Sequence, residues 1–426
     1  MDVRQLRSWS SALRERLGYT SGDVKFRTFF LLLLLAACAK ESPLQHPGPP
    51  RKPISLPPAS DAEERGSVIN FGRGSCVVSR TGEALLSVSS LAAIDGDPTS
   101  YWMNPPGDLP QSMVISLAAK TRIEKIGIRS VGRATMAKNV AFEVSNDGRS
   151  FTPLATIAFS GKSEVQWQAV QPAAANYVRA TIEPVDHDVR LVSILAHGKE
   201  LEPPRPPRIA GCWFVNEQRP ASFVENGARV TGTMEMPREK MTFDGGNDGR
   251  IVRLEWIRGR EFGYAVITTS PDGTQMSGIE WHEEPIPIFF ADAWFAGHAD
   301  CPPPAAPSDV VATSFLEHTG RHSLYGLRFR DDGSLDVALS GDALKQLSRL
   351  IAGKSVRLVA HEFREADAGA NRARAQRELD ALKQQLSNEE LGRVTFVAAG
   401  SDNARQIPPS EAARELYSTV DLEVGR

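Results

Sequence analysis

Clusters of proline divide this 426-residue chain and limit which parts of it can pack together. Proline lacks a backbone N–H and fixes φ, so a run of prolines interrupts helices and sheets and forms an extended connection. Prolines gather within residues 39–66, at 203–207 and at 302–307. Domains commonly hold roughly 100–200 residues, so a chain of this length also exceeds one core. We therefore expect a tether at 38–66 and three folded domains, at 67–200, 209–301 and 309–426.

The N-terminal segment contains a short apolar run that ends at a cysteine. Residues 29–37 are Phe, Leu and Ala only, Lys25 and Arg27 precede them, and Cys38 follows. A basic stretch, an apolar run and small residues before a cleavage position are the parts of a signal peptide. The run is shorter than the roughly 20 residues of a membrane-spanning helix. An ordinary cleaved signal peptide with an incidental cysteine is the alternative, and the long polar stretch before Lys25 suggests that translation starts near Val24.

This segment resembles the lipobox of bacterial lipoproteins. The resemblance implies that residues 1–37 form the signal segment and that Cys38 carries covalent lipid, diacylglycerol and a further acyl chain such as palmitate. Each buried methylene contributes about 0.8 kcal/mol to membrane anchoring. Ala39 stands where an aspartate commonly retains lipoproteins in the inner membrane. The resemblance thus implies an anchor in the outer membrane, with the domains on its periplasmic face or at the cell surface.

The charge and the cysteine content of the chain indicate which ligands and covalent links to expect. Lys and Arg number 49 against 52 Asp and Glu, a net charge of -3, which gives no reason to expect nucleic acid. The chain has 4 cysteines, and none lies in a His/Cys cluster with zinc spacing. Cys212 and Cys301 stand at the two ends of the middle domain, so an oxidising compartment would allow a disulfide between them. Cys76 would then be a free, buried thiol.

The first domain has the pattern of a β-sandwich. Period-two alternation predicts short strands at 114–117, 123–128, 142–145 and 177–182. Asn146-Asp147-Gly148 supplies a tight hairpin turn after the third of these.

The order of these segments resembles the discoidin family, also called the coagulation factor type C domain. The matching stretches are 93–102, which reads AIDGDPTSYW, and 145–151, which reads SNDGRSF. The resemblance implies a jelly-roll sandwich whose loops at one end bind carbohydrates, phospholipid head groups or proteins. Many relatives hold a structural calcium, and Asp95, Asp97 and Thr99 are oxygen donors that suit a hard cation. A turn shaped by aspartate and glycine is the alternative. Ser193 stands where many relatives carry an acidic residue, and Trp102 is expected in the core.

The middle domain is rich in glycine and aromatic residues, and successive hairpins predict a small antiparallel barrel or sandwich of no recognised family. His282-Glu283-Glu284 is interpreted as a strand end with exposed charges. The stretch 244–249, DGGNDG, lacks the glutamate that completes an EF-hand and is interpreted as a flexible turn.

The third domain alternates strands and helices. Strands are predicted at 324–329, 355–361, 393–398 and 420–424, and helices at 342–352 and at about 370–385. This order predicts a mixed α/β sheet covered by helices.

The third domain resembles the OmpA-like peptidoglycan-binding domain. Members of that family hold the peptide stem with an aspartate and an arginine, and the corresponding positions here are Phe363 and Glu378. Asn371 matches the family pattern, and Arg374 and Arg377 are the candidate substitutes for the missing arginine. The loss of both charges favours a spacer or a protein-docking module over peptidoglycan binding in the usual way.

These observations leave three functions open. The first is a non-enzymatic, lipid-anchored envelope protein that binds a glycan or protein through the discoidin-like domain and contacts the cell wall or a partner through the OmpA-like domain. The second is a glycan-processing enzyme with catalysis in the middle domain, although that domain is smaller than a glycosidase barrel of about 250 residues and offers no convincing carboxylate pair. The third is a structural subunit of an envelope complex.

Overall fold

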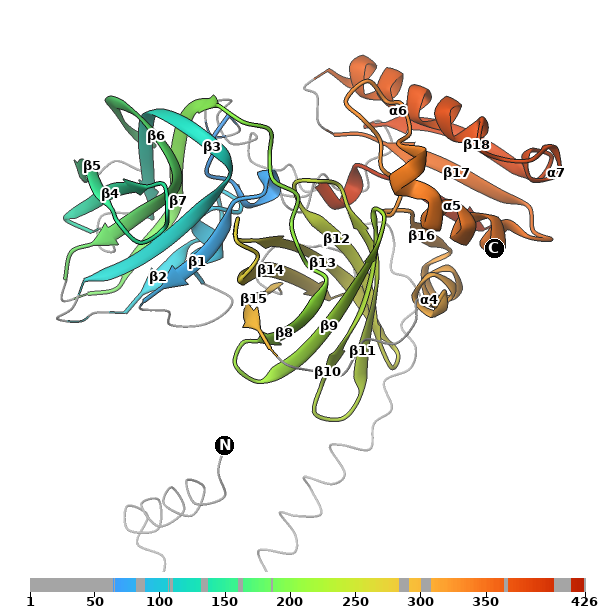
Figure 1. Ribbon diagram of the computed structural model, residues 1–426, viewed down its shortest axis with the longest axis horizontal. Coiled ribbons are helices and arrows are strands. Elements are labelled where there is room, and N and C mark those ends of the chain that lie inside the picture. Colours follow the sequence, from blue (N-terminus) through green and yellow to red (C-terminus); the bar gives the residue numbers. More distant parts are fainter. Residues whose placement is uncertain are drawn as a thin grey trace, which may run out of the picture. The chain divides into compact units, whose positions relative to one another are not determined.

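The computed structural model describes residues 64, 66–81, 89–105, 107, 110–131, 137–159, 164–184, 187–282, 291–299, 308–363, 367–401 and 415–424 (Figure 1). The chain divides into two units, Met1–Ser55 and Leu56–Arg426, and every described residue belongs to the second. Cys38, Cys301, Glu283 and Glu284 lie outside the described residues. Within the described part of the chain, no helix has the length and apolar character to cross a membrane.

Seven strands form the first sheet, in the order β2-β7-β3-β6-β4-β5 with β1 paired to β3. Their bounds are β1 Cys76–Arg80, β2 Trp102–Asn104, β3 Gln111–Ser130, β4 Asn139–Ser145, β5 Thr152–Ala158, β6 Gln166–Ile182 and β7 Val189–Glu200, with short 3₁₀ helices η1 Phe71–Arg73 and η3 Ser90–Ala93. The two separate strands predicted at 114–117 and 123–128 are wrong as separate elements, because β3 runs through both. Its pairing with β6 shifts register between Ser116 and Thr121, and such irregularities let a long strand bend. Figure 1 shows the resulting curvature of β3 and β6.

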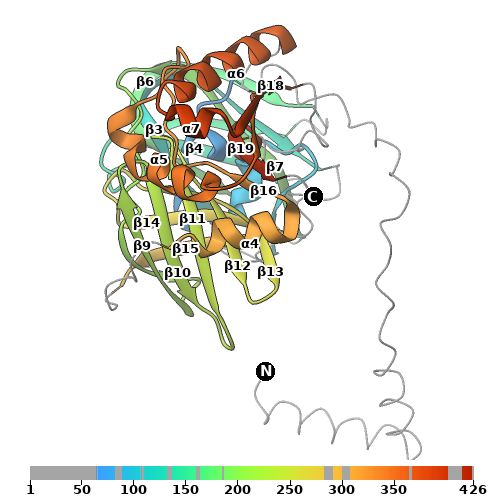
Figure 2. The same cartoon turned by 90° about the vertical axis from the view of Figure 1, so that its right-hand side faces the viewer.

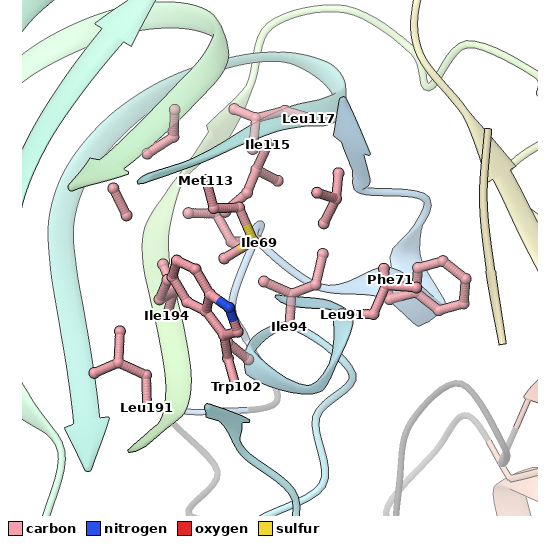
Figure 3. Close-up of a cluster of buried hydrophobic side chains, with 14 of the residues drawn as sticks. Ile69, Phe71, Leu91, Ile94, Trp102, Met113, Ile115, Leu117, Leu191 and Ile194 are labelled. Atoms are coloured by element: carbon pink, nitrogen blue, oxygen red, sulfur yellow. The ribbon is translucent and has the colours of Figure 1, made fainter. Parts of the chain in front are cut away.

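Trp102 lies in the core of this sandwich, as expected. Its side chain has 0% exposure, and Figure 3 shows its indole among Ile94, Leu191 and Ile194. A sandwich core forms when the inward-facing residues of its layers interdigitate. The predicted hairpin is also confirmed, because Gly148 adopts φ +72 between β4 and β5.

The middle segment forms a closed antiparallel barrel, as the hairpin pattern predicts, in the order β10-β11-β12-β13-β14-β15-β8-β9. The bounds are β8 Gly211–Val215, β9 Arg219–Asn226, β10 Arg229–Glu235, β11 Lys240–Asn247, β12 Val252–Arg258, β13 Glu261–Thr269, β14 Gln275–His282 and β15 Ala291–His298. Alternate residues point inward, and large side chains such as Trp213, Phe243, Trp256 and Trp294 fill the interior. The flexible turn predicted at 244–249 is wrong for residues 244–247, which lie in β11, where Asp244 is 1% exposed.

The third segment contains a mixed sheet in the order β16-β19-β17-β18, in which β17 and β18 are parallel. The bounds are α4 Val310–Thr319, β16 Arg321–Ser323, α5 Val337–Ile351, β17 Val356–His361, α6 Ala368–Lys383, α7 Asn388–Leu391, β18 Val394–Gly400 and β19 Val420–Val424. Helix α6 packs on β17 and β18, and Figure 2 shows it beside β18. The mixed α/β sheet is as expected, but helix α4 was not.

The strand predicted at 324–329 is wrong. The strand is β16, three residues long, and the chain turns directly after it at Tyr325 and Gly326. This turn packs against the barrel, where a Cβ at Gly246 would lie 1.9 Å from Tyr325 O. The apolar residues of this stretch therefore reflect burial in a turn rather than a strand, with Leu324 and Leu327 in the core of the third segment and Tyr325 against the barrel.

Candidate functional site

The loop between η3 and β2 folds around two carboxylates. Asp95 Oδ1 accepts from Asp97 N at 2.8 Å, and Ser100 Oγ donates to both Asp95 oxygens at 3.0 Å. Asp97 Oδ1 accepts from Thr99 N at 2.7 Å and from Thr99 Oγ1 at 2.6 Å. The three predicted oxygen donors therefore lie together in one turn.

Both carboxylates are buried, with Asp95 and Asp97 each 1% exposed. Burial, and then the negative charge of Asp97, raise the pKa of Asp95 well above its usual value. Asp97 Oδ2 is buried and has no hydrogen-bond partner. Ionised carboxylates removed from water need a compensating positive charge or donors, so the chemistry of this donor set fits a bound cation.

The side chains alone do not complete a calcium shell, which takes 6–8 oxygen ligands. Among the described residues, no group of three His, Cys, Asp or Glu is placed to hold a metal ion. Ser193, which stands at the family's acidic position, is in β7 opposite Arg129. Backbone carbonyls and water would therefore have to supply the remaining ligands.

An aromatic residue follows the acidic loop, and an arginine from β7 lies over its ring. Tyr101 is partly exposed, and the Arg190 guanidinium carbon lies 5.2 Å from the centre of its ring. Arg190 is opposite Met103 in the pairing of β7 with β2. An aromatic face beside a guanidinium offers both a stacking surface and hydrogen-bond donors.

The candidate peptidoglycan residues lie on helix α6, but two of them are buried: Asn371 is 2% exposed and Arg374 is 7% exposed. Arg374 donates to the carbonyls of Asp331 and Arg330 at 2.8 and 3.2 Å and to Glu378 at 3.2 Å. Arg377 is exposed and donates to Asp332 O at 2.9 Å.

The acidic side chain of Glu378 has a structural explanation. Its side chain is 3% exposed, and Glu362, 3.4 Å from Arg374, is also buried. The arginine is thus held between two carboxylates inside the domain. Its contacts compensate buried charge, which favours a structural role for Arg374 over ligand binding.

The cysteine predictions concern the middle segment. Cys212 is disulfide-bonded. Its partner lies outside the described residues, so the pairing with Cys301 stays a prediction. Among the described residues Cys76 is a free thiol and is buried, as expected.

Sequence reasoning missed the buried charges between the barrel and the third segment. Arg229 donates to Asp244 at 3.0 and 2.8 Å and to Asp342 at 3.0 Å. His322 Nδ1 lies 2.6 Å from Glu255 Oε2, and both side chains are buried. Asp342 and His322 are far in the sequence from their barrel partners, and the packing of the third segment against the barrel brings them together.

Comparison with known proteins identifies one part of the chain. Residues 77–193 match the F5/8 type C domain family. This result supports the discoidin-like identity of the first domain. No curated protein matches the chain.

Several solved structures are similar to part of this chain at low sequence identity. The C-terminal domain of a chitobiase from Bacteroides fragilis is 20% identical, with 30% of this chain and 96% of that chain covered and a TM-score of 0.28. The family 32 carbohydrate-binding module of NanJ from Clostridium perfringens, in complex with galactose, is 18% identical, with 31% and 97% covered and a TM-score of 0.26. A chitosan-binding module from Paenibacillus sp. IK-5 is 17% identical, with 31% and 98% covered and a TM-score of 0.27.

Proposed function

We propose that the protein is a non-enzymatic envelope protein that binds a glycan through its F5/8 type C domain. The observation that carries this proposal is the match of residues 77–193 to that family. The loop at 95–100 and the adjoining Tyr101 and Arg190 support it, because they place an aromatic ring and a guanidinium beside a rigid turn. Sugar rings stack on aromatic faces while charged and polar groups bind their hydroxyls.

Calcium is proposed as the structural cofactor of this domain. Asp95, Asp97 and Thr99 would supply side-chain oxygens, and the ion would compensate the two buried carboxylates. The ion would hold the loop in place, and the side chains of Tyr101 and Arg190 would contact the sugar.

A lipid anchor on Cys38 is part of the same proposal. The apolar run before Cys38 and the proline-rich stretch after it support an outer-membrane lipoprotein whose domains stand off the membrane. Metabolic labelling with a palmitate analogue should mark the native protein and leave Cys38→Ala unlabelled. Labelling of the Cys38→Ala variant would contradict the anchor.

The third segment is proposed as a spacer or docking module. The internal contacts of Arg374 support this role over contact with peptidoglycan. Cosedimentation of the protein with purified sacculi tests the point. Stoichiometric binding of the native protein that is lost in Arg377→Ala would contradict this role and support peptidoglycan binding instead.

Glycan binding is tested by calorimetric titration with galactose, N-acetylgalactosamine and chitosan oligosaccharides. We expect saturable binding to at least one sugar, weakened about tenfold by Tyr101→Ala, since an aromatic contact contributes up to about 1.5 kcal/mol. Tyr417→Phe, on the third segment, serves as the control. Absence of binding to every sugar, or reproducible glycan cleavage abolished by Glu283→Gln or Glu284→Gln, would overturn the proposal.

A further inference from the structure

The outer face of the first sheet displays a tryptophan that the loop-end site does not use. Trp167 in β6 is directly opposite Gly127 in β3. A Cβ at Gly127 would lie 2.6, 2.8 and 2.9 Å from Cε3, Cζ3 and Cδ2 of the indole. Nearly equal distances to three adjacent ring atoms place the glycine against the face of the ring, since an approach to the edge would give unequal distances. The six-membered ring therefore lies flat on the sheet.

The other face of this ring is turned away from the sheet. The Lys125 ammonium lies over it, with Nζ 4.4 Å from the ring centre. Because the backbone of Gly127 occupies the inner side, the ammonium is on the outer side. Trp167 and Lys125 are both partly exposed. A lysine on a flexible four-carbon stem can move aside for a ligand while its charge stays within reach.

A third side chain completes the cluster. His197 in β7 is opposite Lys125 in the strand pairing, and its ring meets Trp167 at 4.6 Å and 81°, edge to face. Lys199 follows two residues later and is exposed, and strand alternation puts it on the same face as His197. The surface thus combines one flat aromatic face, one imidazole and two ammonium groups.

We propose that the Trp167–Lys125–His197 cluster is a second glycan site, which binds a sugar residue carrying a carboxylate. The apolar face of the sugar stacks on the outer face of Trp167. The carboxylate pairs with Lys125, a charge-assisted contact that a neutral sugar cannot make. His197 hydrogen-bonds a hydroxyl group from the adjacent strand.

This inference goes beyond the proposed function, because the cluster lies on the sheet face and uses none of the loop residues 95–101. The two sites are separable by mutation. Tyr101→Ala tests the loop end, and substitutions at Trp167 and Lys125 test the sheet face. Loss of one site therefore leaves the other measurable.

The experiment is calorimetric titration of the whole protein with tetragalacturonate and, as the matched neutral probe, its fully methyl-esterified form. We expect the acid to bind at least about tenfold more tightly than the ester, a difference of about 1.4 kcal/mol. Lys125→Met, which keeps the length of the side chain, should abolish this difference. Trp167→Ala should weaken both probes, and Tyr417→Phe, on the third segment, should weaken neither.

Trp167→Ala also uncovers Gly127, so thermal unfolding of each variant is recorded first, and Lys125→Met provides the reading if Trp167→Ala does not fold. Equal affinity for acid and ester, no binding of either, or full binding by Lys125→Met would overturn the proposal. Binding lost in Tyr101→Ala but retained in the sheet-face variants would also overturn it, because the acid would then occupy the loop end.

Discussion

At the scale of single residues, Asp97 is the side chain on which the cation proposal depends. Its Oδ2 is buried without a hydrogen-bond partner, while Oδ1 holds the backbone and hydroxyl of Thr99. We expect millimolar calcium to raise the melting temperature of the native protein relative to EDTA. Asp97→Asn keeps the shape of the side chain but removes the charge, so the calcium-dependent rise should disappear.

Asp147→Asn is the matched control for the calcium measurement, since Asp147 also shapes a turn through its carboxylate but lies at the exposed β4–β5 hairpin. It should retain the full response to calcium. A melting temperature of the native protein that is the same in calcium and in EDTA would show that the loop is held by hydrogen bonds alone.

The His322–Glu255 pair makes stability depend on pH. Burial alone would lower the pKa of His322, but the Glu255 carboxylate outweighs it, so the pKa is raised above 6.5. A histidine with a raised folded pKa stabilises the fold below its unfolded pKa, and this contribution is lost as pH rises through the folded value. Burial also raises the pKa of Glu255 above 4.5, which acts in the same direction. Stability should therefore fall as pH rises above about 6.5, with a slope of at most about 1.4 kcal/mol per pH unit for one proton.

His322→Gln tests this pH dependence through urea unfolding midpoints measured from pH 6 to 9. The variant should be less stable at pH 6, where the native imidazolium compensates Glu255, and its midpoints should change less with pH. His318→Gln is the control, because His318 is exposed and contacts Ser314 O on its own helix. Parallel curves for the native protein and His322→Gln would contradict the assignment.

At the scale of elements, the sequence predicts those whose pattern reflects their own burial. Strand β19 at Val420–Val424 and the barrel hairpins follow from alternation. Helix α5 begins at Val337, five residues before the predicted start, because Asp336 caps it by accepting from Leu339 N. Val337 and Leu339 are 46% and 42% exposed. The first turn of α5 therefore lies outside the buried apolar pattern from which the helix was predicted.

Elements that depend on a distant partner escape prediction. Helix α4 has no side-chain cap, and Phe315 packs edge to face on Phe262 and Tyr264 of the barrel. The same holds for the candidate sites. The acidic loop is local and could be read from spacing, whereas the contact of Trp167 with Gly127 requires the register of β3 and β6.

On helix α6, introducing an arginine at position 378 should destabilise the protein for a structural reason. Glu378→Arg would place a second guanidinium next to Arg374, four residues earlier on the same buried face. Losing one member of a buried ion pair costs about 3–5 kcal/mol. We expect a loss of that size in urea unfolding, while Asp380→Arg at an exposed position of the same helix should change stability by less than about 1 kcal/mol. A stable Glu378→Arg variant would contradict the compensating role of Glu378.

At the scale of the whole described unit, buried ionic contacts join the barrel to the third segment. Arg229, 2% exposed, connects Asp244 of β11 with Asp342 of α5, and Gln346 of α5 donates to Asp244 at 2.6 Å. Arg229→Met would leave Asp244 buried without its guanidinium. We expect a loss of about 3–5 kcal/mol in the free energy of unfolding.

The matched control for Arg229 is Arg349→Met. Arg349 pairs with Asp309, but its side chain is 52% exposed, and exposed pairs contribute about 1 kcal/mol or less. Equal losses in the free energy of unfolding for the two variants would show that the contact between the barrel and the third segment does not depend on the buried Arg229.

Cys76 lies where the sandwich contacts the barrel, so its reactivity depends on whether these two surfaces are separated. Its sulfur lies 3.4 Å from Ser277 Oγ, so the first strand of the sandwich meets the barrel at this thiol. Burial raises its pKa to about 11, which keeps it protonated and unreactive at neutral pH. Alkylation of Cys76 therefore requires the sandwich and barrel surfaces to separate at this point. The rate of labelling would measure how often that separation occurs, without a cysteine having to be introduced by mutation.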